Sequence, residues 1–128
     1  MMDVLRISPG YVHHNHDLVH DAKKEGVLMS HVDVMFGVFD GNQIMGFGGI
    51  VLYTNNAVFK SDYVLPEYRG RGLYRKITEA RMDYITQKGI KKVEARCTQN
   101  SLPMFVNMGF VEKHYWPGEK VTLVEKHL

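Results

Sequence analysis

The sequence has little of three things that would narrow its class at once: cysteine, long hydrophobic runs and net charge. Its single cysteine, Cys97, excludes an internal disulfide and suits a reducing compartment. No apolar run reaches the length of a transmembrane helix, and the N-terminus lacks a signal-peptide pattern. The net charge of +2 is too small to favour nucleic acid as a partner. We therefore expect a cytoplasmic protein without a membrane partner.

What the sequence does have is enough apolar material for one folded domain. It is 128 residues long and 45% hydrophobic, which fits a single domain, residues 1–128, with a proper core. It contains no internal repeat, linker or low-complexity segment. Alternation and helical spacing predict strands over residues 4–7, 32–39, 44–53, 58–65, 92–97, 110–116 and 121–124, and helices before Gly26, over 73–88 and over 101–108.

Glycine and apolar spacing add detail to this pattern. Asp40-Gly41-Asn42 is typical of a hairpin, and Gly46, Gly48 and Gly49 in the following strand suggest a bulge or a close approach by another group. The helix after residue 72 has the clearest apolar stripe, and the strand after it must run parallel to the strand before it. The stripe is formed by Leu73, Ile77, Ala80 and Tyr84, with Ile85 beside it.

A histidine-rich stretch lies near the N-terminus. His16 and His20 are four residues apart, so a helix would place both imidazoles on one face. Metal binding would need further ligands, and nothing later in the chain offers a matching pair. We therefore favour solvated or substrate-facing histidines and expect no metal.

The chain is organised around a glycine-rich turn. Leu65 closes a strand, because the following Pro66 pushes it into the extended region, and Gly70 and Gly72 then allow a tight turn into the helix. Free N–H groups of the first helical turn and the positive end of the helix dipole make such a corner an anion site. Neighbouring basic side chains suit phosphate oxygens; they are Arg69, Arg71, Arg75 and Lys76.

Two common phosphate motifs do not fit this turn. No G-x-x-x-x-G-K-[ST] string occurs, and Arg75 stands where a G-x-G-x-x-G fingerprint needs its third glycine. The segment Pro66-Glu67-Tyr68-Arg69-Gly70-Arg71-Gly72-Leu73 instead resembles the coenzyme A loop of GNAT-type N-acetyltransferases, with the signature [Q/R]-x-x-G-x-[G/A]. Tyr74 departs from that signature, because it replaces a small residue. A plain turn with solvated arginines is the alternative.

The order of elements, β-α-β-β-β-α-β-α-β-β, resembles the same family. The resemblance implies an α/β (α+β) fold: a mixed, mostly antiparallel sheet of six or seven strands, a splayed central parallel pair and about three helices. Residues 11–31 have room for barely one of the two helices usual there, so the acceptor site should be open. The resemblance further implies that acetyl-CoA is bound by Tyr63, Val64, Arg69, Gly70, Arg71, Gly72, Leu73, Tyr74, Arg75, Asn100 and Phe105.

The chemistry implied by the resemblance is direct acetyl transfer to a primary amine. Backbone N–H around Val64 would meet the thioester carbonyl. Glu94 is the preferred base and Asp62 the second choice, whereas Glu94 could instead only pair with Arg96 or Lys113. Many family members carry a tyrosine acid where this chain has Phe105. Candidates for the missing acid are Ser101, Tyr68 and Tyr115. His31 and His114 have suitable chemistry but no support from position, and Cys97 is expected to be a buried hydrophobe.

Three functions stay open at this point. The leading hypothesis is an acetyl-CoA-dependent N-acetyltransferase, whose acceptor is a protein lysine, an N-terminus or a small amine. Tyr74 and Phe105 motivate the alternative of a weak or inactive coenzyme-binding or interaction protein. The basic turn motivates a third, weaker reading as a nucleic-acid-binding domain. The last hairpin, with Tyr115 and Trp116, could serve a homodimer contact.

Overall fold

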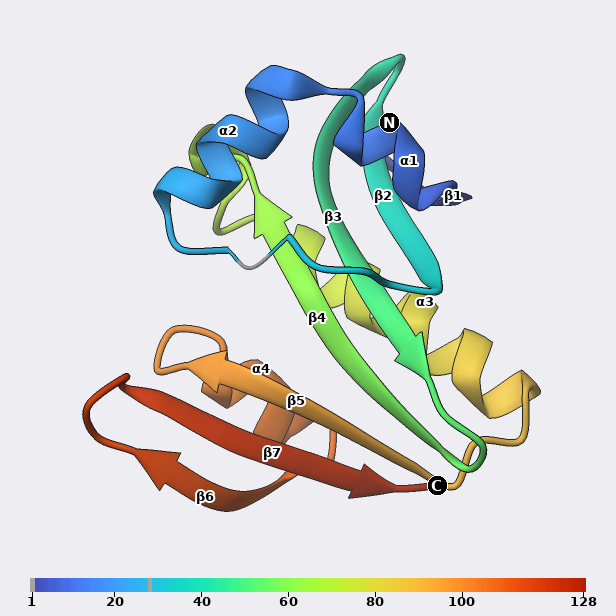
Figure 1. Cartoon of the computed structure of the whole chain (residues 1–128), viewed down its shortest axis with the longest axis vertical. Coiled ribbons are helices and arrows are strands. Elements are labelled where there is room, and N and C mark those ends of the chain that lie inside the picture. Colours follow the sequence, from blue (N-terminus) through green and yellow to red (C-terminus); the bar gives the residue numbers. More distant parts are fainter. Residues whose placement is uncertain (1, 28) are drawn as a thin grey trace.

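A computed structural model describes residues 2–27 and 29–128 and shows one seven-stranded sheet with helices against both faces (Figure 1). The strand order is β1-β2-β3-β4-β5-β7-β6. Every neighbouring pair is antiparallel except β4 and β5, which run parallel. The prediction of a mixed sheet with one parallel pair is therefore confirmed. In the described part of the chain, no helix is long and apolar enough to cross a membrane.

The elements follow the predicted order along the chain. The strands are β1 (Met2–Ile7), β2 (Val34–Asp40), β3 (Gln43–Leu52), β4 (Asn56–Val64), β5 (Lys92–Thr98), β6 (Val111–Trp116) and β7 (Val121–His127). The helices are α1 (Pro9–His13), α2 (His16–Lys24), α3 (Leu73–Gln87) and α4 (Leu102–Asn107), with a short 3₁₀ turn η1 (Pro66–Tyr68).

The segment before β2 differs from the prediction, because it forms two short helices rather than one. The Ser8 side chain accepts a hydrogen bond from the N–H of Gly10, and Pro9 occupies the first turn, so α1 begins directly after β1. The Asn15 side chain accepts from the N–H of Leu18 and starts α2. Ser8-Pro9 is thus a helix start as well as a strand stop, and the described chain has four α-helices where about three were expected.

The middle of β4 contains a bulge. Ser61 has a left-handed backbone with φ 60, and the register with β3 shifts between Phe47 and Gly49. An extra residue reverses the side-chain alternation of a strand. Phe59 and Asp62 therefore both contact Arg81 of helix α3.

The glycines of β3 allow this close packing. A Cβ at Gly48 would lie 2.8 Å from Ile77 Cγ2 and 3.0 Å from Arg81 Nη1, and a Cβ at Gly49 would lie 3.0 Å from the Lys60 carbonyl oxygen. The prediction of a bulge or a close approach at these glycines is confirmed.

Helix α3 buries a stripe that differs from the predicted one. Leu73, Ile77, Arg81 and Ile85, each four residues apart, are buried, whereas Ala80 and Tyr84 are only partly covered. Hydropathy excluded Arg81 from the predicted core, yet its side chain is fully buried. The reason is an ion pair with Asp62 from the neighbouring strand, which compensates the buried charge.

Candidate active site

The two central strands part along half of their length. β4 and β5 pair only from Asn56 to Phe59 and from Lys92 to Ala95, although β4 continues to Val64 and β5 to Thr98. Figure 1 shows the two strands diverging from their paired ends. The predicted splay is therefore present, and it leaves strand backbone available to a ligand.

The glycine-rich turn lies where β4 meets α3. Gly70 and Gly72 have φ +77 and +76, and a Cβ at either position would meet nothing within 4 Å. Gly72 is the N-cap of α3 and offers no side chain to the first-turn N–H groups. These donors lie at the positive end of a 15-residue helix. The turn is thus an open cradle that fits an anion such as a diphosphate.

A cavity of about 740 Å³ connects this turn with the parted strands. Most of the predicted coenzyme residues line it, together with two of the three predicted catalytic residues. These are Tyr63, Val64, Arg69, Gly70, Gly72, Leu73, Tyr74, Arg75 and Asn100, with Asp62 and Ser101.

Two predicted coenzyme residues lie outside this lining. The Arg71 guanidinium stacks 5.0 Å from the centre of the Tyr68 ring. Phe105 is fully buried and packs edge-to-face against Tyr74 and Phe110, with ring centroids 6.1 and 5.0 Å apart. Phe105 is therefore a core residue beneath the site, because its apolar ring has no hydroxyl that would draw it toward the cavity.

A second cavity, of about 540 Å³, adjoins the first and contains Glu94, the third predicted catalytic residue. Lys60, Arg96 and Glu119 also line it. The two cavities share Glu25, Val27, Asp62, Tyr74, Thr98 and Ser101. A ligand in one cavity would therefore meet a ligand in the other at this common wall.

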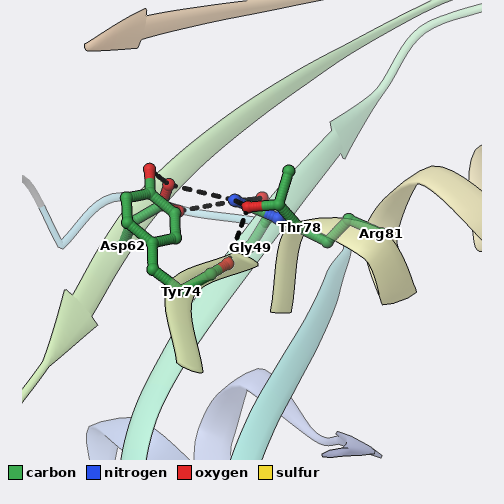
Figure 2. Close-up of polar contacts among 5 residues, drawn as sticks. All are labelled: Gly49, Asp62, Tyr74, Thr78 and Arg81. Atoms are coloured by element: carbon green, nitrogen blue, oxygen red, sulfur yellow. Dashed lines mark hydrogen bonds and ion pairs between the residues drawn. The ribbon is translucent and has the colours of Figure 1, made fainter. Parts of the chain in front are cut away.

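Asp62 is held in a network of short hydrogen bonds (Figure 2). It accepts from the Tyr74 hydroxyl at 2.5 Å and from Arg81 Nη1 and Nη2 at 2.6 and 3.1 Å. Arg81 also donates to the Gly49 carbonyl at 3.1 Å and to Thr78 Oγ1 at 3.0 Å. Because both carboxylate oxygens of Asp62 already have donors, the geometry favours Asp62 as an anchor of the site over Asp62 as a free base.

The electrostatics of this network keep it in one charge state. Burial, the largest single effect, lowers the pKa of Arg81, but the charge of Asp62, the neighbouring Tyr74 and their hydrogen bonds together outweigh it, so the pKa is raised and the guanidinium stays charged. Burial, followed by the charge of Asp62, raises the pKa of Tyr74 well above its ordinary value. Tyr74 therefore stays protonated and donates to a charged Asp62.

Glu94 makes a different contact from the one expected. Its Oε1 lies 3.1 Å from Lys92 Nζ on the same strand. The two expected partners are engaged elsewhere, since Lys113 pairs with Glu125 at 3.4 Å and Arg96 lies 4.6 Å from the centre of the Trp116 ring. Glu94 is half-buried, so an acceptor in the second cavity can reach its carboxylate.

Ser101 and Cys97 lie at the carboxyl end of β5. Ser101 is at the N-cap position of α4, but its hydroxyl donates to the Thr98 carbonyl at 3.4 Å and does not cap the helix as expected. It lines both cavities. Burial is the main cause that raises the pKa of the Cys97 thiol to about 11, so the thiol stays protonated, as befits a buried hydrophobe.

The other acid and base candidates divide by position. Tyr68 lines the first cavity, whereas Tyr115, His31 and His114 line neither. His31 Nε2 contacts Asp33 at 3.1 Å, and His114 packs against Trp116. Among the described residues, no group of three or more metal-ligating side chains occurs.

Sequence reasoning missed one residue of the site, Glu25 at the end of α2. It accepts from Arg69 Nη2 at 2.8 Å and from the Tyr63 hydroxyl at 2.9 Å, while Arg69 Nε donates to the Val64 carbonyl at 2.8 Å. The bond from Arg69, then that from Tyr63, lowers the pKa of Glu25. Burial, followed by the bond to Glu25, raises the pKa of Tyr63 to about 12. No local pattern marks Glu25, because its partners lie about forty positions later in the chain.

The fold is similar to those of several solved acetyltransferases. The PaiA N-acetyltransferase of Thermoplasma acidophilum, solved with coenzyme A, matches with a TM-score of 0.79 at 12% identity over 100% of this chain and 99% of that one. A GNAT-family acetyltransferase of Staphylococcus aureus matches with a TM-score of 0.77 at 12% identity, over 100% and 99%. The ribosomal-protein-S18-alanine N-acetyltransferase of Escherichia coli matches with a TM-score of 0.72 at 14% identity, over 99% and 94%. At these identities the likeness establishes the fold.

Family membership rests on the sequence profile. A search of curated proteins gave no match. The profile of the acetyltransferase (GNAT) family matches residues 4–110, which is most of the chain. The chain therefore belongs to the GNAT acetyltransferase family, as the glycine-rich turn and the order of elements predicted.

Proposed function

We propose that this protein is an N-acetyltransferase that moves an acetyl group from acetyl-CoA to a primary amine by direct attack. The observation that carries the proposal is the cavity that connects the open Gly70–Gly72 cradle with the parted ends of β4 and β5. A diphosphate fits the cradle, and an extended arm fits between the strands. When bound, acetyl-CoA supplies a thioester carbonyl that the amine attacks, and cleavage of the C–S bond releases the thiol.

The chain would hold the coenzyme by backbone and basic side chains. First-turn N–H groups after Gly72 face the diphosphate, and Arg75, half exposed on the same turn, adds positive charge. Leu65 N–H donates to the Met45 carbonyl of β3. Because successive N–H groups of a strand point in opposite directions, the N–H of Val64 points into the gap, where it can stabilise negative charge on a carbonyl oxygen.

Proton transfer falls to Glu94 and Ser101 in this proposal. Glu94 lies in the second cavity, so its carboxylate can take a proton from the acceptor ammonium before attack. Ser101 lies on the wall shared by the two cavities and can donate a hydrogen bond to the departing thiolate, which then takes its proton from water. Asp62 contributes by fixing Tyr74 and Arg81.

The acceptor is a primary amine, and we favour a protein lysine or N-terminus over a small amine. Helices α1 and α2 cover the β2–β4 half of the sheet and leave the same side of β5, β7 and β6 without a helix (Figure 1). Such an open face suits an extended substrate. The reducing cytoplasm, indicated by the single free Cys97, is the proposed compartment.

The structure also gives a reason to keep the second hypothesis, a coenzyme-binding protein with weak turnover. Phe105 offers no hydroxyl, and the Tyr74 hydroxyl donates to Asp62, so no phenol proton is available to the thiolate from these two rings.

A homodimer through the exposed edge strand β6 stays a prediction; Tyr115 is 44% exposed there.

The two hypotheses are separated by following the acetyl group itself. The protein is incubated with isotope-labelled acetyl-CoA and a panel of lysine peptides, N-terminal peptides and small amines, and products are identified by mass spectrometry. Transfer of label to an amine, with thiol release at the same rate, is the expected result. Tight coenzyme binding without transfer to any acceptor would favour the weak-turnover hypothesis.

A further inference from the structure

One side chain dominates the wall where the two cavities meet. If the proposed function holds, the coenzyme occupies the first cavity and the amine approaches from the second, so the transferred acyl group must lie at their common wall. Asp62, Tyr74, Thr98 and Ser101 form that wall at the parted strands. Tyr74 is the only one of the four with a large ring, and it enters from the first turn of α3.

The Tyr74 ring is fixed on several sides. Its hydroxyl donates to Asp62 at 2.5 Å. The ring packs in a T-shaped pair with Phe105, at a centroid distance of 6.1 Å and an angle of 88°, and the Arg81 guanidinium lies 5.9 Å from its centre. Figure 2 shows the ring beside Asp62 and Arg81. Moving it would break a hydrogen bond to a charged group that is itself anchored, which makes the ring a rigid surface.

The hydroxyl is poorly suited to act as the missing acid. Its only proton is donated to Asp62, and ionisation would place a phenolate beside that carboxylate. Burial and the Asp62 charge accordingly raise the pKa of Tyr74 well above its ordinary value. The contribution of Tyr74 to the reaction must therefore come from the position of its ring.

We propose that the Tyr74 ring is the steric limit on the acyl group, so that it restricts this enzyme to acetyl and other very short acyl donors. The ring lies between Asp62 on β4 and Phe105 on α4, and removing it would extend both cavities toward the core. A longer acyl chain on the coenzyme could then enter the space that the ring had filled. Tyr74 is thus a specificity-determining residue.

Substitutions at residue 74 separate the ring from the hydroxyl. Tyr74→Phe keeps the ring and loses only the bond to Asp62, whereas Tyr74→Ala removes both. Tyr74→Leu keeps an apolar side chain that is shorter than the ring. It replaces Tyr74→Ala in the experiment if the alanine variant is too unstable. Tyr53→Ala is the matched control, because Tyr53 is 60% exposed and lines neither cavity.

The experiment measures kcat/KM by thiol release, and Kd by calorimetry, for acetyl-, butyryl- and hexanoyl-CoA. The native protein and the Tyr74→Phe and Tyr53→Ala variants should disfavour longer chains by roughly tenfold or more for each added methylene. Tyr74→Ala, and to a smaller degree Tyr74→Leu, should lose that preference. An unchanged chain-length profile in folded Tyr74→Ala or Tyr74→Leu would overturn this inference alone. Failure of the native protein to bind any acyl-CoA would overturn the proposed function and this inference with it.

Discussion

Arg81 and Asp62 form a salt bridge of 2.6 Å that ties helix α3 to strand β4 directly beneath the site. The guanidinium side chain is 0% exposed and the carboxylate side chain 18% exposed. Removing one partner of a buried pair leaves the other charge uncompensated, which typically costs about 3–5 kcal/mol. The salt bridge therefore connects the stability of the fold to the shape of the gap between the strands.

We expect Arg81→Met to lower the free energy of unfolding by about 3–5 kcal/mol, measured by urea denaturation. The control is Arg75→Met on the same helix, because Arg75 is half exposed and lies 4.0 Å from Glu79. An exposed pair of this kind contributes about 0–1 kcal/mol. Equal losses of unfolding free energy in the two variants would show that the buried pair stabilises the protein no more than the exposed pair does.

Packing under β3 gives a second prediction. A Cβ at Gly48 would lie within 3.0 Å of Ile77 and Arg81, so Gly48→Ala should destabilise the protein by about 1–3 kcal/mol through overpacking. Gly118→Ala is the control, because a Cβ there meets nothing within 4 Å. Thermal unfolding of both variants provides the comparison. A midpoint for Gly48→Ala as high as that for Gly118→Ala would mean that α3 lies farther from β3 than described.

The raised pKa of Tyr63 should make the free energy of unfolding depend on pH in the alkaline range. Burial and the bond to Glu25 raise its pKa to about 12, above the ordinary value of 10.0. The folded state thus holds the proton more tightly than the unfolded state. The stability from this group is fully present below pH 10 and is lost as the pH rises through about 12.

The measurement is the absorbance of tyrosinate together with urea midpoints at increasing pH. The native protein should show a component that titrates at about pH 12, and Tyr63→Phe should lack it. The urea midpoint of the variant should also fall less steeply in that range. A native titration curve identical to that of Tyr63→Phe would contradict the described contact with Glu25.

Glu94 is the residue on which the proposed proton transfer depends. Glu94→Gln removes the carboxylate and should lower kcat by about 10²–10⁴-fold with little change in Kd for acetyl-CoA. Glu112→Gln, an exposed change on β6, is the control. Steady-state thiol release with the best acceptor measures both variants. A kcat for Glu94→Gln within about twofold of the native value would assign the base to another residue.

The sequence predicted what depends on local pattern. Alternation located the strands, Asp40-Gly41-Asn42 located the hairpin, and Gly70 and Gly72 located the cradle, because each of these signals is contained in a few neighbouring residues. The helix before Gly26 was predicted, but the shorter helix α1 was not, because Ser8-Pro9 was interpreted only as the end of a strand.

What the sequence could not predict are contacts between distant segments. The burial of Arg81 depends on Asp62, which faces α3 only because a bulge at Ser61 reverses the alternation of β4. The one available signal was a four-residue spacing that includes Arg81, formed by Leu73, Ile77, Arg81 and Ile85. It was not used because arginine is too hydrophilic to count as a core residue. The bonds from Arg69 and Tyr63 to Glu25 likewise arise only after folding.

The central claim is that the cradle at the start of α3 holds the diphosphate of acetyl-CoA while its arm lies between β4 and β5. Calorimetric titration of acetyl-CoA tests this claim most directly, with Gly72→Glu as the variant that puts a negative charge in the cradle. Gly89→Glu is the control, because Gly89 has the same φ of +76, equally open surroundings and no place in either cavity. We predict binding to the native protein and to Gly89→Glu and none to Gly72→Glu. Equal binding by all three proteins, or no binding by the native protein at millimolar acetyl-CoA, would contradict the account.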